Sequence, residues 1–169
     1  MFTPTITKFD LKEGDKLFYR WNGFFGWIIR IYEAMLARDW KHIFIAFTHT
    51  AQMVYNREID DIERFDAMEW LKTGFRPVIW KAYVFRWEEP MTGHQAMVWR
   101  NYIIARKWSD YDLWGAVTGK ENEFQDYCSE LSTNADIACG KMKDIKWRLR
   151  PQQYYKKLRK RLVFIWVIV

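Results

Sequence analysis

Residues 127–131 of the chain read YCSEL, and they open a stretch of apolar periodicity that predicts a helix over residues 128–142. The cysteine of this stretch, Cys128, therefore falls at a predicted helix N-terminus. Free backbone N–H groups and the helix dipole favour an anion there, so we expect the pKa of the Cys128 thiol to be depressed. The alternative interpretation is a buried cysteine that packs as a small hydrophobic side chain.

The segments around this helix alternate between strand-like and helical patterns. Helical spacing of apolar residues covers 22–38 and 88–108, and a basic helical segment follows Pro151. Strand-like composition covers the ranges 16–20, 43–55, 65–70, 77–87 and 162–169, whereas 56–64 is expected to be a charged loop. The pattern predicts an α+β fold, in which a small, mostly antiparallel sheet packs against helices. We expect one domain over 1–155, followed by a basic and then hydrophobic segment over 156–169 that is either a final strand or a membrane-proximal tail.

His49 is the candidate base for a cysteine nucleophile. On a strand, its side chain shares one face with Ala51 and Met53 and can reach a helix packed on the sheet. Thiol catalysis also needs a third group that orients the imidazole, and Glu69 lies on the next predicted strand. Gln52 is an alternative polar partner. Taken singly, His49 also fits a structural or surface histidine, and Glu69 a solvated carboxylate.

Composition bounds the class of protein. The chain has 169 residues, of which 50% are hydrophobic and 19% aromatic, so it can bury a core and is not a disordered segment. Its net charge is +6, and the excess of basic residues is concentrated near the C-terminus. The basic residues of that cluster are Lys156, Lys157, Arg159, Lys160 and Arg161. We expect this cluster and the apolar run after it either to contact an anionic membrane, or the run to be a final strand in the sheet or part of a partner interface.

Cysteine usage and the N-terminal sequence indicate the compartment. Two cysteines do not make a disulfide framework, and the first residues lack the pattern of a secretory signal. The apolar run over 162–169 is far shorter than the roughly 20 residues that a membrane-spanning helix needs. We therefore expect a cytoplasmic protein, with membrane association as an open possibility.

The order and spacing of these motifs resemble one family. Gly14-Asp15 before a strand, Thr48-His49-Thr50, the segment 65–69, Tyr111-Asp112 and the YCSEL stretch are similar to the circularly permuted NlpC-type amidases, the YiiX-like group of papain-fold proteins. In that group the base precedes the nucleophile along the chain. The resemblance implies a permuted papain-like fold over most of the chain and a thiol-dependent hydrolase activity.

The resemblance also implies roles for individual residues. Cys128 would attack a carbonyl as the thiolate, His49 would take and return a proton, and Glu69 would hold the imidazole ring. The Cys128 backbone N–H, with the hydroxyl of Tyr111, would stabilise the oxyanion, and Tyr127 and Gln52 would help to position the substrate. The expected substrate contains an amide bond in a peptide, an isopeptide link or a cell-wall peptide.

Two other functions remain open at this point. Relatives of the lecithin-retinol acyltransferase type use the same cysteine and histidine on lipid acyl groups, which would suit the hydrophobic tail and the aromatic content. A basic, aromatic binding module without catalysis is the other alternative. We do not expect a nucleic acid partner, because the aromatic residues fall at core spacings and the charge is concentrated in the tail.

The remaining reactive residue types predict no second site. Cys139 falls nearly in line with Cys128 on the predicted helix, but about three turns away, and is expected in the core. His42 and His94 have no partners at metal-ligand spacing, so we expect no metal and no cofactor. The acidic residues Glu121, Glu123 and Asp126 are expected in a solvated loop that borders the site.

Overall fold

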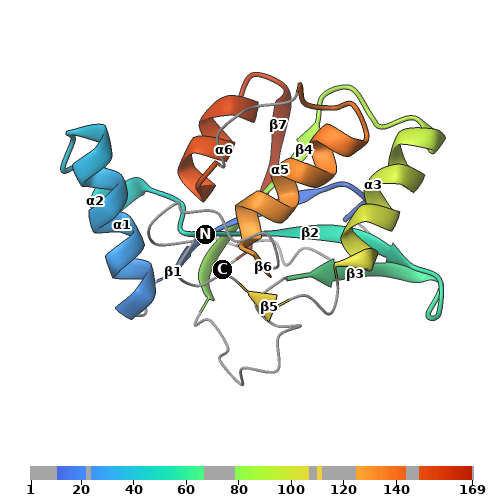
Figure 1. Cartoon of the computed structure of the whole chain (residues 1–169), viewed down its shortest axis with the longest axis horizontal. Coiled ribbons are helices and arrows are strands. Elements are labelled where there is room, and N and C mark those ends of the chain that lie inside the picture. Colours follow the sequence, from blue (N-terminus) through green and yellow to red (C-terminus); the bar gives the residue numbers. More distant parts are fainter. Residues whose placement is uncertain are drawn as a thin grey trace, which may run out of the picture.

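A five-stranded antiparallel sheet in the order β3-β2-β1-β4-β7 forms the centre of the molecule (Figure 1). The computed structural model describes residues 11–21, 24–66, 79–106, 110–111, 125–143 and 149–168. The sheet strands are β1 (Lys16–Trp21), β2 (His49–Asn56), β3 (Asp61–Phe65), β4 (Ile79–Trp87) and β7 (Leu162–Ile168). Two short parallel strands are β5 (Asp110–Tyr111) and β6 (Gln125–Asp126). The helices are α1 (Phe24–Ala37), α2 (His42–Ile45), α3 (Gly93–Ala105), α5 (Cys128–Ala138) and α6 (Pro151–Leu158). The predicted α+β class is confirmed.

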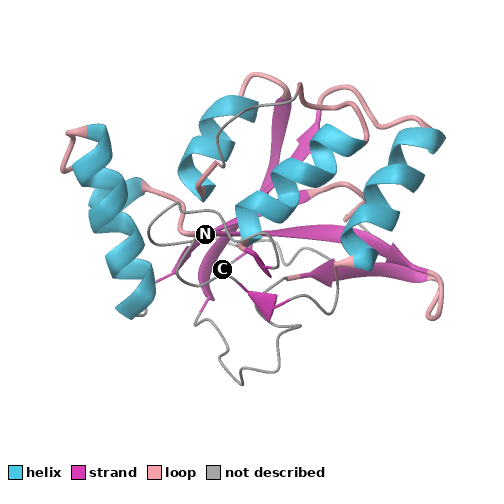
Figure 2. Cartoon of the chain, viewed as in Figure 1, coloured by secondary structure: helices cyan, strands magenta, loops and turns pink. Residues whose placement is uncertain are grey.

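Helices α3, α5 and α6 cover one face of the sheet, whereas α1 and α2 lie together at one end of the molecule (Figure 2). Strand alternation decides which side chains meet the helices. Phe18 on β1 packs against Tyr154 of α6 with ring centroids 5.7 Å apart, while its neighbours Leu17 and Tyr19 belong to a separate apolar cluster with Ala51 of β2. The two faces of the sheet therefore carry different apolar clusters.

A second cluster joins α5 and α3 to the β2–β3 edge. It contains Val54, Phe65, Trp99, Ile103, Leu131, Ala135 and Cys139. Cys139 is thus part of the apolar core, and burial raises the pKa of its thiol. Helix α5 is consequently held against the sheet along its length by apolar contacts.

A buried carboxylate provides a polar link between the same elements. Asp136 of α5 accepts hydrogen bonds from Lys16 Nζ of β1 at 2.9 Å and from Trp99 Nε1 of α3 at 3.1 Å. Its second oxygen accepts the hydroxyl of Tyr154 of α6 at 2.5 Å. The Lys16 ammonium also lies 5.1 Å from the ring centre of Trp87 on β4. Because these side chains are almost fully buried, breaking one partner leaves an uncompensated charge, which is strongly destabilising.

Several predicted boundaries differ from the structure. Residues 43–45, predicted as the beginning of a strand, belong to the short helix α2, and residues 61–64 are part of β3 rather than a loop. Charged side chains are tolerated in β3 because it is an edge strand of the sheet. Helix α3 begins at Gly93, later than predicted, because Thr92 caps it: the Thr92 hydroxyl accepts the backbone N–H of Gln95 at 3.2 Å. Helix α5 ends at Ala138, and Gly140, at φ 77°, follows its end.

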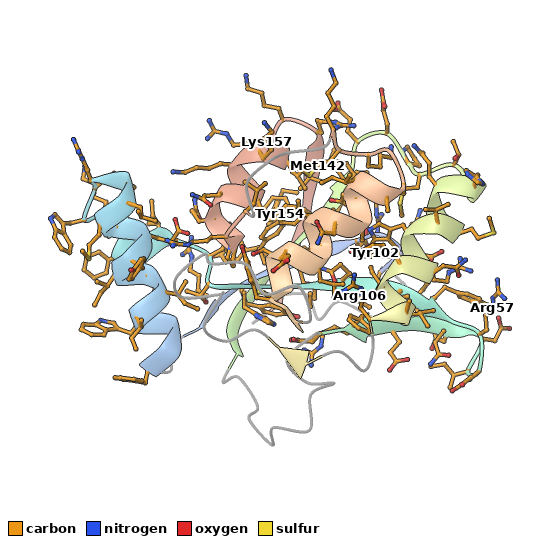
Figure 3. The ribbon with its side chains drawn as sticks, viewed as in Figure 1. Arg57, Tyr102, Arg106, Met142, Tyr154 and Lys157 are labelled. Atoms are coloured by element: carbon orange, nitrogen blue, oxygen red, sulfur yellow. The ribbon has the colours of Figure 1, made fainter. Side chains whose placement is uncertain are left out.

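The C-terminal segment forms secondary structure that packs on the domain. The predicted boundary after residue 155 falls inside α6, and β7 pairs with β4 along the edge of the sheet. Leu158 is buried in the core cluster beneath α6, whereas Lys157 stands on the outer side of that helix (Figure 3). Among the described residues, no helix combines the length and apolar character needed to cross a membrane.

Candidate active site

Cys128 is the first residue of α5, where the backbone changes from extended to helical. The preceding residue, Tyr127, has extended backbone angles (φ −98°, ψ 164°) and is fully buried at the N-cap position. The backbone N–H groups of a first helical turn have no partner within the helix and point toward its N-terminal end. The positive end of the helix dipole there favours a thiolate over a thiol.

His49 is the first residue of β2 and lies beside this helix terminus. Its Nε2 is 2.6 Å from Oδ1 of Asp66, the residue directly after β3. The side chain of Cys128 also forms a hydrogen bond with the imidazole. Since Asp66 occupies Nε2, we infer that Nδ1 is the ring nitrogen left to interact with the sulfur. The ring of Tyr19 stacks on the imidazole with centroids 5.8 Å apart, which restricts its rotation.

The electrostatics of this group favour a protonated imidazole. Burial by itself lowers the pKa of His49, but the negative charges of Asp66 and Cys128 and their hydrogen bonds to the ring outweigh burial. The resulting pKa of His49 is well above its ordinary value. The imidazole of His49 is therefore favoured in its protonated form beside the Asp66 carboxylate.

A network of hydroxyl and amide groups supports the first turn of α5. The Ser132 hydroxyl donates to the backbone carbonyl of Cys128 at 2.7 Å. The side-chain amide of Gln52 donates to the Ser132 oxygen, and the Thr50 hydroxyl lies 3.2 Å from the same oxygen. Gln52 and Thr50 belong to β2, which also carries His49. The network therefore links the strand of the base to the helix of the cysteine.

Only some of the predicted site residues lie next to Cys128 in the part of the chain that the structure describes. Cys128, His49 and Tyr127 lie together, whereas Gln52 contacts Ser132, one turn along the helix from the cysteine. Tyr111 on β5 pairs with Asp126 on β6, so its backbone lies close to the chain segment that leads into Cys128.

Sequence reasoning missed Asp66. Glu69, the residue predicted for the orienting role, lies outside the described residues, and the carboxylate bonded to His49 is that of Asp66. Strand alternation contains the signal that identifies it. Phe65 pairs with Gln52 and packs toward α5, so the next side chain along β3 points to the face of His49.

The described residues hold no second reactive cluster. Among them, no group of three or more histidine, cysteine, aspartate or glutamate side chains has the arrangement of a metal site. Cys128 and Cys139 are both unpaired with other cysteines. The arrangement at Cys128 brings a thiol, an imidazole and a carboxylate together.

Comparisons with known proteins find similarity among solved structures. No protein-family model matches the chain, and no curated protein sequence matches it. The chain is similar to the crystal structure of metalloprotein YiiX from Escherichia coli O157:H7, with 15% identity, a TM-score of 0.47, and coverage of 89% of this chain and 81% of that chain. YiiX gives its name to the group that the sequence motifs resemble. A likeness at this level carries no argument about activity, so function is inferred from the geometry of the site.

Proposed function

We propose that the chain is a cysteine hydrolase that cleaves an amide bond through an acyl-thioester on Cys128. The observation that carries this proposal is a buried group of three side chains, in which His49 is hydrogen-bonded to both Asp66 and Cys128. Each of the three is at most 2% exposed, so their interactions are little screened by water. The proposed bond is the amide of a peptide, an isopeptide link or a cell-wall peptide.

In the proposed acylation step, Cys128 starts as a thiolate and His49 as an imidazolium. The Cys128 thiolate attacks the carbonyl carbon, a C–S bond forms, and the carbonyl π electrons move to the oxygen. We assign the backbone N–H groups at the start of α5, including that of Cys128, as donors to this oxyanion because they lie at the N-terminal end of the helix. The His49 imidazolium then gives its Nδ1 proton to the amide nitrogen, the C–N bond breaks, and the amine leaves.

Deacylation uses the same residues, but His49 now acts as a base instead of an acid. Neutral His49 takes a proton from a water molecule as the water oxygen attacks the thioester carbon. Collapse of the tetrahedral intermediate breaks the C–S bond, releases the carboxylic acid product and restores the thiolate beside the imidazolium. Asp66 stays ionised throughout and holds the ring with Nδ1 toward the sulfur.

A lipid acyl group is the second candidate substrate. The observation in its favour is the apolar surface of α1 and α2, where Phe44 and Ile45 of α2 are 76% and 49% exposed only a few residues before His49. The same thiolate would attack an ester carbonyl, and an alcohol would leave instead of an amine. Hydrolysis of matched amide and ester substrates with the same acyl group separates the two candidates.

The proposal is tested by the reactivity of the two cysteines in one molecule. We expect iodoacetamide to alkylate Cys128 well below the pH range of an ordinary thiol, whose pKa is about 8.5. Cys139 is an internal control, because burial raises its pKa and no histidine is bonded to it among the described residues. The alkylated positions are measured by mass spectrometry as a function of pH in the wild type and in His49→Ala.

The outcomes separate catalysis from binding. Early alkylation of Cys128 that is lost in His49→Ala, together with an acid-stable acyl adduct on Cys128 after incubation with an activated ester, supports the hydrolase. If both cysteines react alike and His49→Ala changes nothing, the thiol is a structural group and the hydrolase proposal is rejected.

A further inference from the structure

We propose that α1 and α2 form a docking surface for the interfacial region of an anionic phospholipid bilayer. The α1–α2 surface, as we use the term, consists of Phe24, Trp27, Met35, Leu36, Trp40, Phe44 and Ile45. These side chains are between 49% and 76% exposed. The proposal does not depend on the chemistry at Cys128.

Helix α1 has its apolar side outward. At 100° per residue, its exposed and half-exposed apolar side chains, from Phe24 to Leu36, cover roughly half of the helix circumference. The inward side buries Ile29 and Ala34 together with a carboxylate, that of Glu33, which is only 4% exposed, whereas Phe24 is 70% exposed. A surface helix of a globular protein normally turns its wide apolar side toward the core. The exposed side of α1 is therefore suited to an apolar environment.

The exposed apolar residues extend along the chain from α1 through the turn into α2, and the two helices contact each other. Trp40, in the turn, is 65% exposed, and Phe44 of α2 is 76% exposed. Side chains stand out from both helices on the side away from the sheet (Figure 3). Contiguous exposed apolar side chains on this scale are typical of interaction sites rather than of a free monomer surface.

The charges at the edge of this surface favour an anionic bilayer as the occupant. Among the side chains described between Phe24 and Ile45, the exposed charges are those of Arg38 and Lys41, and both are positive. Asp39, between them, accepts the backbone N–H of Lys41 at 3.0 Å. Cations that flank tryptophan and aliphatic side chains suit the boundary between anionic headgroups and acyl chains.

The length of α1 indicates that it lies in the interface and does not cross it. Its 14 residues are fewer than the roughly 20 that a helical span requires. Its amphipathic character, with one apolar side and one side packed on the protein, fits a helix that lies parallel to the membrane plane.

Contacts to the rest of the domain fix the position of this unit. The guanidinium of Arg150, at the start of α6, lies 5.0 Å from the ring centre of Tyr32 on α1. Gln152 of α6 accepts the backbone N–H of Phe47, between α2 and β2, at 2.9 Å. Docking through α1 and α2 would therefore hold the whole domain at the bilayer surface, with the segment that leads into His49 next to it.

Flotation of the full chain with vesicles tests the proposal. The vesicles are phosphatidylcholine alone, or phosphatidylcholine with phosphatidylglycerol. The surface variant replaces three exposed aromatic residues by serine: Trp27→Ser, Trp40→Ser and Phe44→Ser. A matched control replaces three exposed apolar residues elsewhere on the molecule by serine: Ile59→Ser, Met97→Ser and Ile104→Ser. Because all six side chains are at least 43% exposed, neither variant is expected to unfold, which circular dichroism checks.

We expect the wild type and the matched control to float with anionic vesicles, and flotation to weaken in neutral vesicles and at high salt. The surface variant should bind at least about tenfold more weakly, because each large aromatic side chain alone changes partitioning by about that factor. Wild-type protein that stays in the soluble fraction, or a surface variant that floats like the wild type, would overturn the proposal.

Two further outcomes identify a different occupant. If the wild type is a dimer by light scattering, the surface variant is a monomer and neither floats, the α1–α2 surface binds a second copy of the chain and the proposal is wrong. If Lys156→Glu with Lys157→Glu abolishes flotation while Arg38→Glu with Lys41→Glu does not, the bilayer binds the basic C-terminal segment instead, and the proposal is again overturned.

Discussion

Replacement of Asp66 by asparagine tests the proposed site most directly, because the two amino acids have nearly the same shape and differ in charge. The 2.6 Å bond between Asp66 and His49 is a charge-assisted hydrogen bond in a fully buried setting. Hydrogen bonds to charged groups contribute about 1.5–3 kcal/mol. If the imidazolium–thiolate pair loses this stabilisation, the rate of hydrolysis should fall by about ten- to a hundredfold.

The sign of the pH effect follows from the cause of the pKa shift. Asp66 is one of the two charges that raise the pKa of His49, so Asp66→Asn lowers that pKa. The imidazolium then stabilises the Cys128 thiolate less, and alkylation of Cys128 begins at a higher pH. The alkaline limit of hydrolysis, which requires a protonated His49, moves to a lower pH.

The assay measures the alkylation rate of Cys128 and the hydrolysis rate between pH 5 and pH 9 in four proteins: the wild type, Asp66→Asn, Glu69→Gln and His49→Ala. Thermal unfolding of each variant excludes a loss of fold. We expect Glu69→Gln to behave like the wild type. If Asp66→Asn keeps the wild-type rates and pH profile while Glu69→Gln loses them, Asp66 does not orient His49 and the reasoning fails.

Three other perturbations address the stability of the site and its support. Asp136→Asn should lower the unfolding free energy by about 3–5 kcal/mol, since it leaves the Lys16 ammonium buried without its counter-charge; a urea-unfolding loss below about 1 kcal/mol would show that the pair is not a structural link. Ser132→Ala should slow alkylation of Cys128 a few-fold and cost about 1 kcal/mol, because the hydroxyl that joins α5 to β2 is lost; unchanged alkylation would exclude a positioning role. Because the folded pKa of His49 is raised, its protonation stabilises the fold fully below pH ~6.5, and this stabilisation is lost as the pH rises through the folded pKa. The difference in melting temperature between wild type and His49→Gln should therefore be largest at acidic pH, and a difference independent of pH would contradict the raised pKa.

Apolar periodicity was sufficient to predict most of the helices and strands. The spacing that predicts a helix over 22–38 arises from the same apolar residues that form α1, although most of them face outward. Periodicity reports that a helix has an apolar side but not whether that side meets the core, because the partner of the helix is set by tertiary structure. The exposure of the α1–α2 surface could therefore not be predicted from the pattern.

The identity of the orienting carboxylate shows a different limit. The sequence contains several acidic residues after β2, and choosing between them requires the register of two paired strands. The pairing of Gln52 with Phe65 sets that register, and it depends on the turn after Asn56 and on the packing of Phe65 against α5. If the register assumed for β3 is wrong by one residue, its side chains are assigned to the opposite faces of the sheet. A neighbouring carboxylate such as Glu69 is then chosen in place of Asp66.

Long-range polar contacts are the least accessible to sequence reasoning. Asp136 lies within the predicted helix and has no local partner, while its donors Lys16, Trp99 and Tyr154 are distributed over three other elements. No spacing rule connects them, because the contact exists only after the sheet and three helices have assembled.

The three hydrogen bonds to Asp136 also fix the position of α5 along its own axis. A slide of α5 by a single residue, about 1.5 Å, would pull the carboxylate away from its donors on β1, α3 and α6 at the same time. Cys128 lies about two turns from Asp136 on the same helix. Because a helix moves as a rigid unit, the hydrogen bonds of Asp136 also fix the position of the Cys128 sulfur. Redesign of the residues around Cys128 must therefore leave Asp136 and its three donors intact.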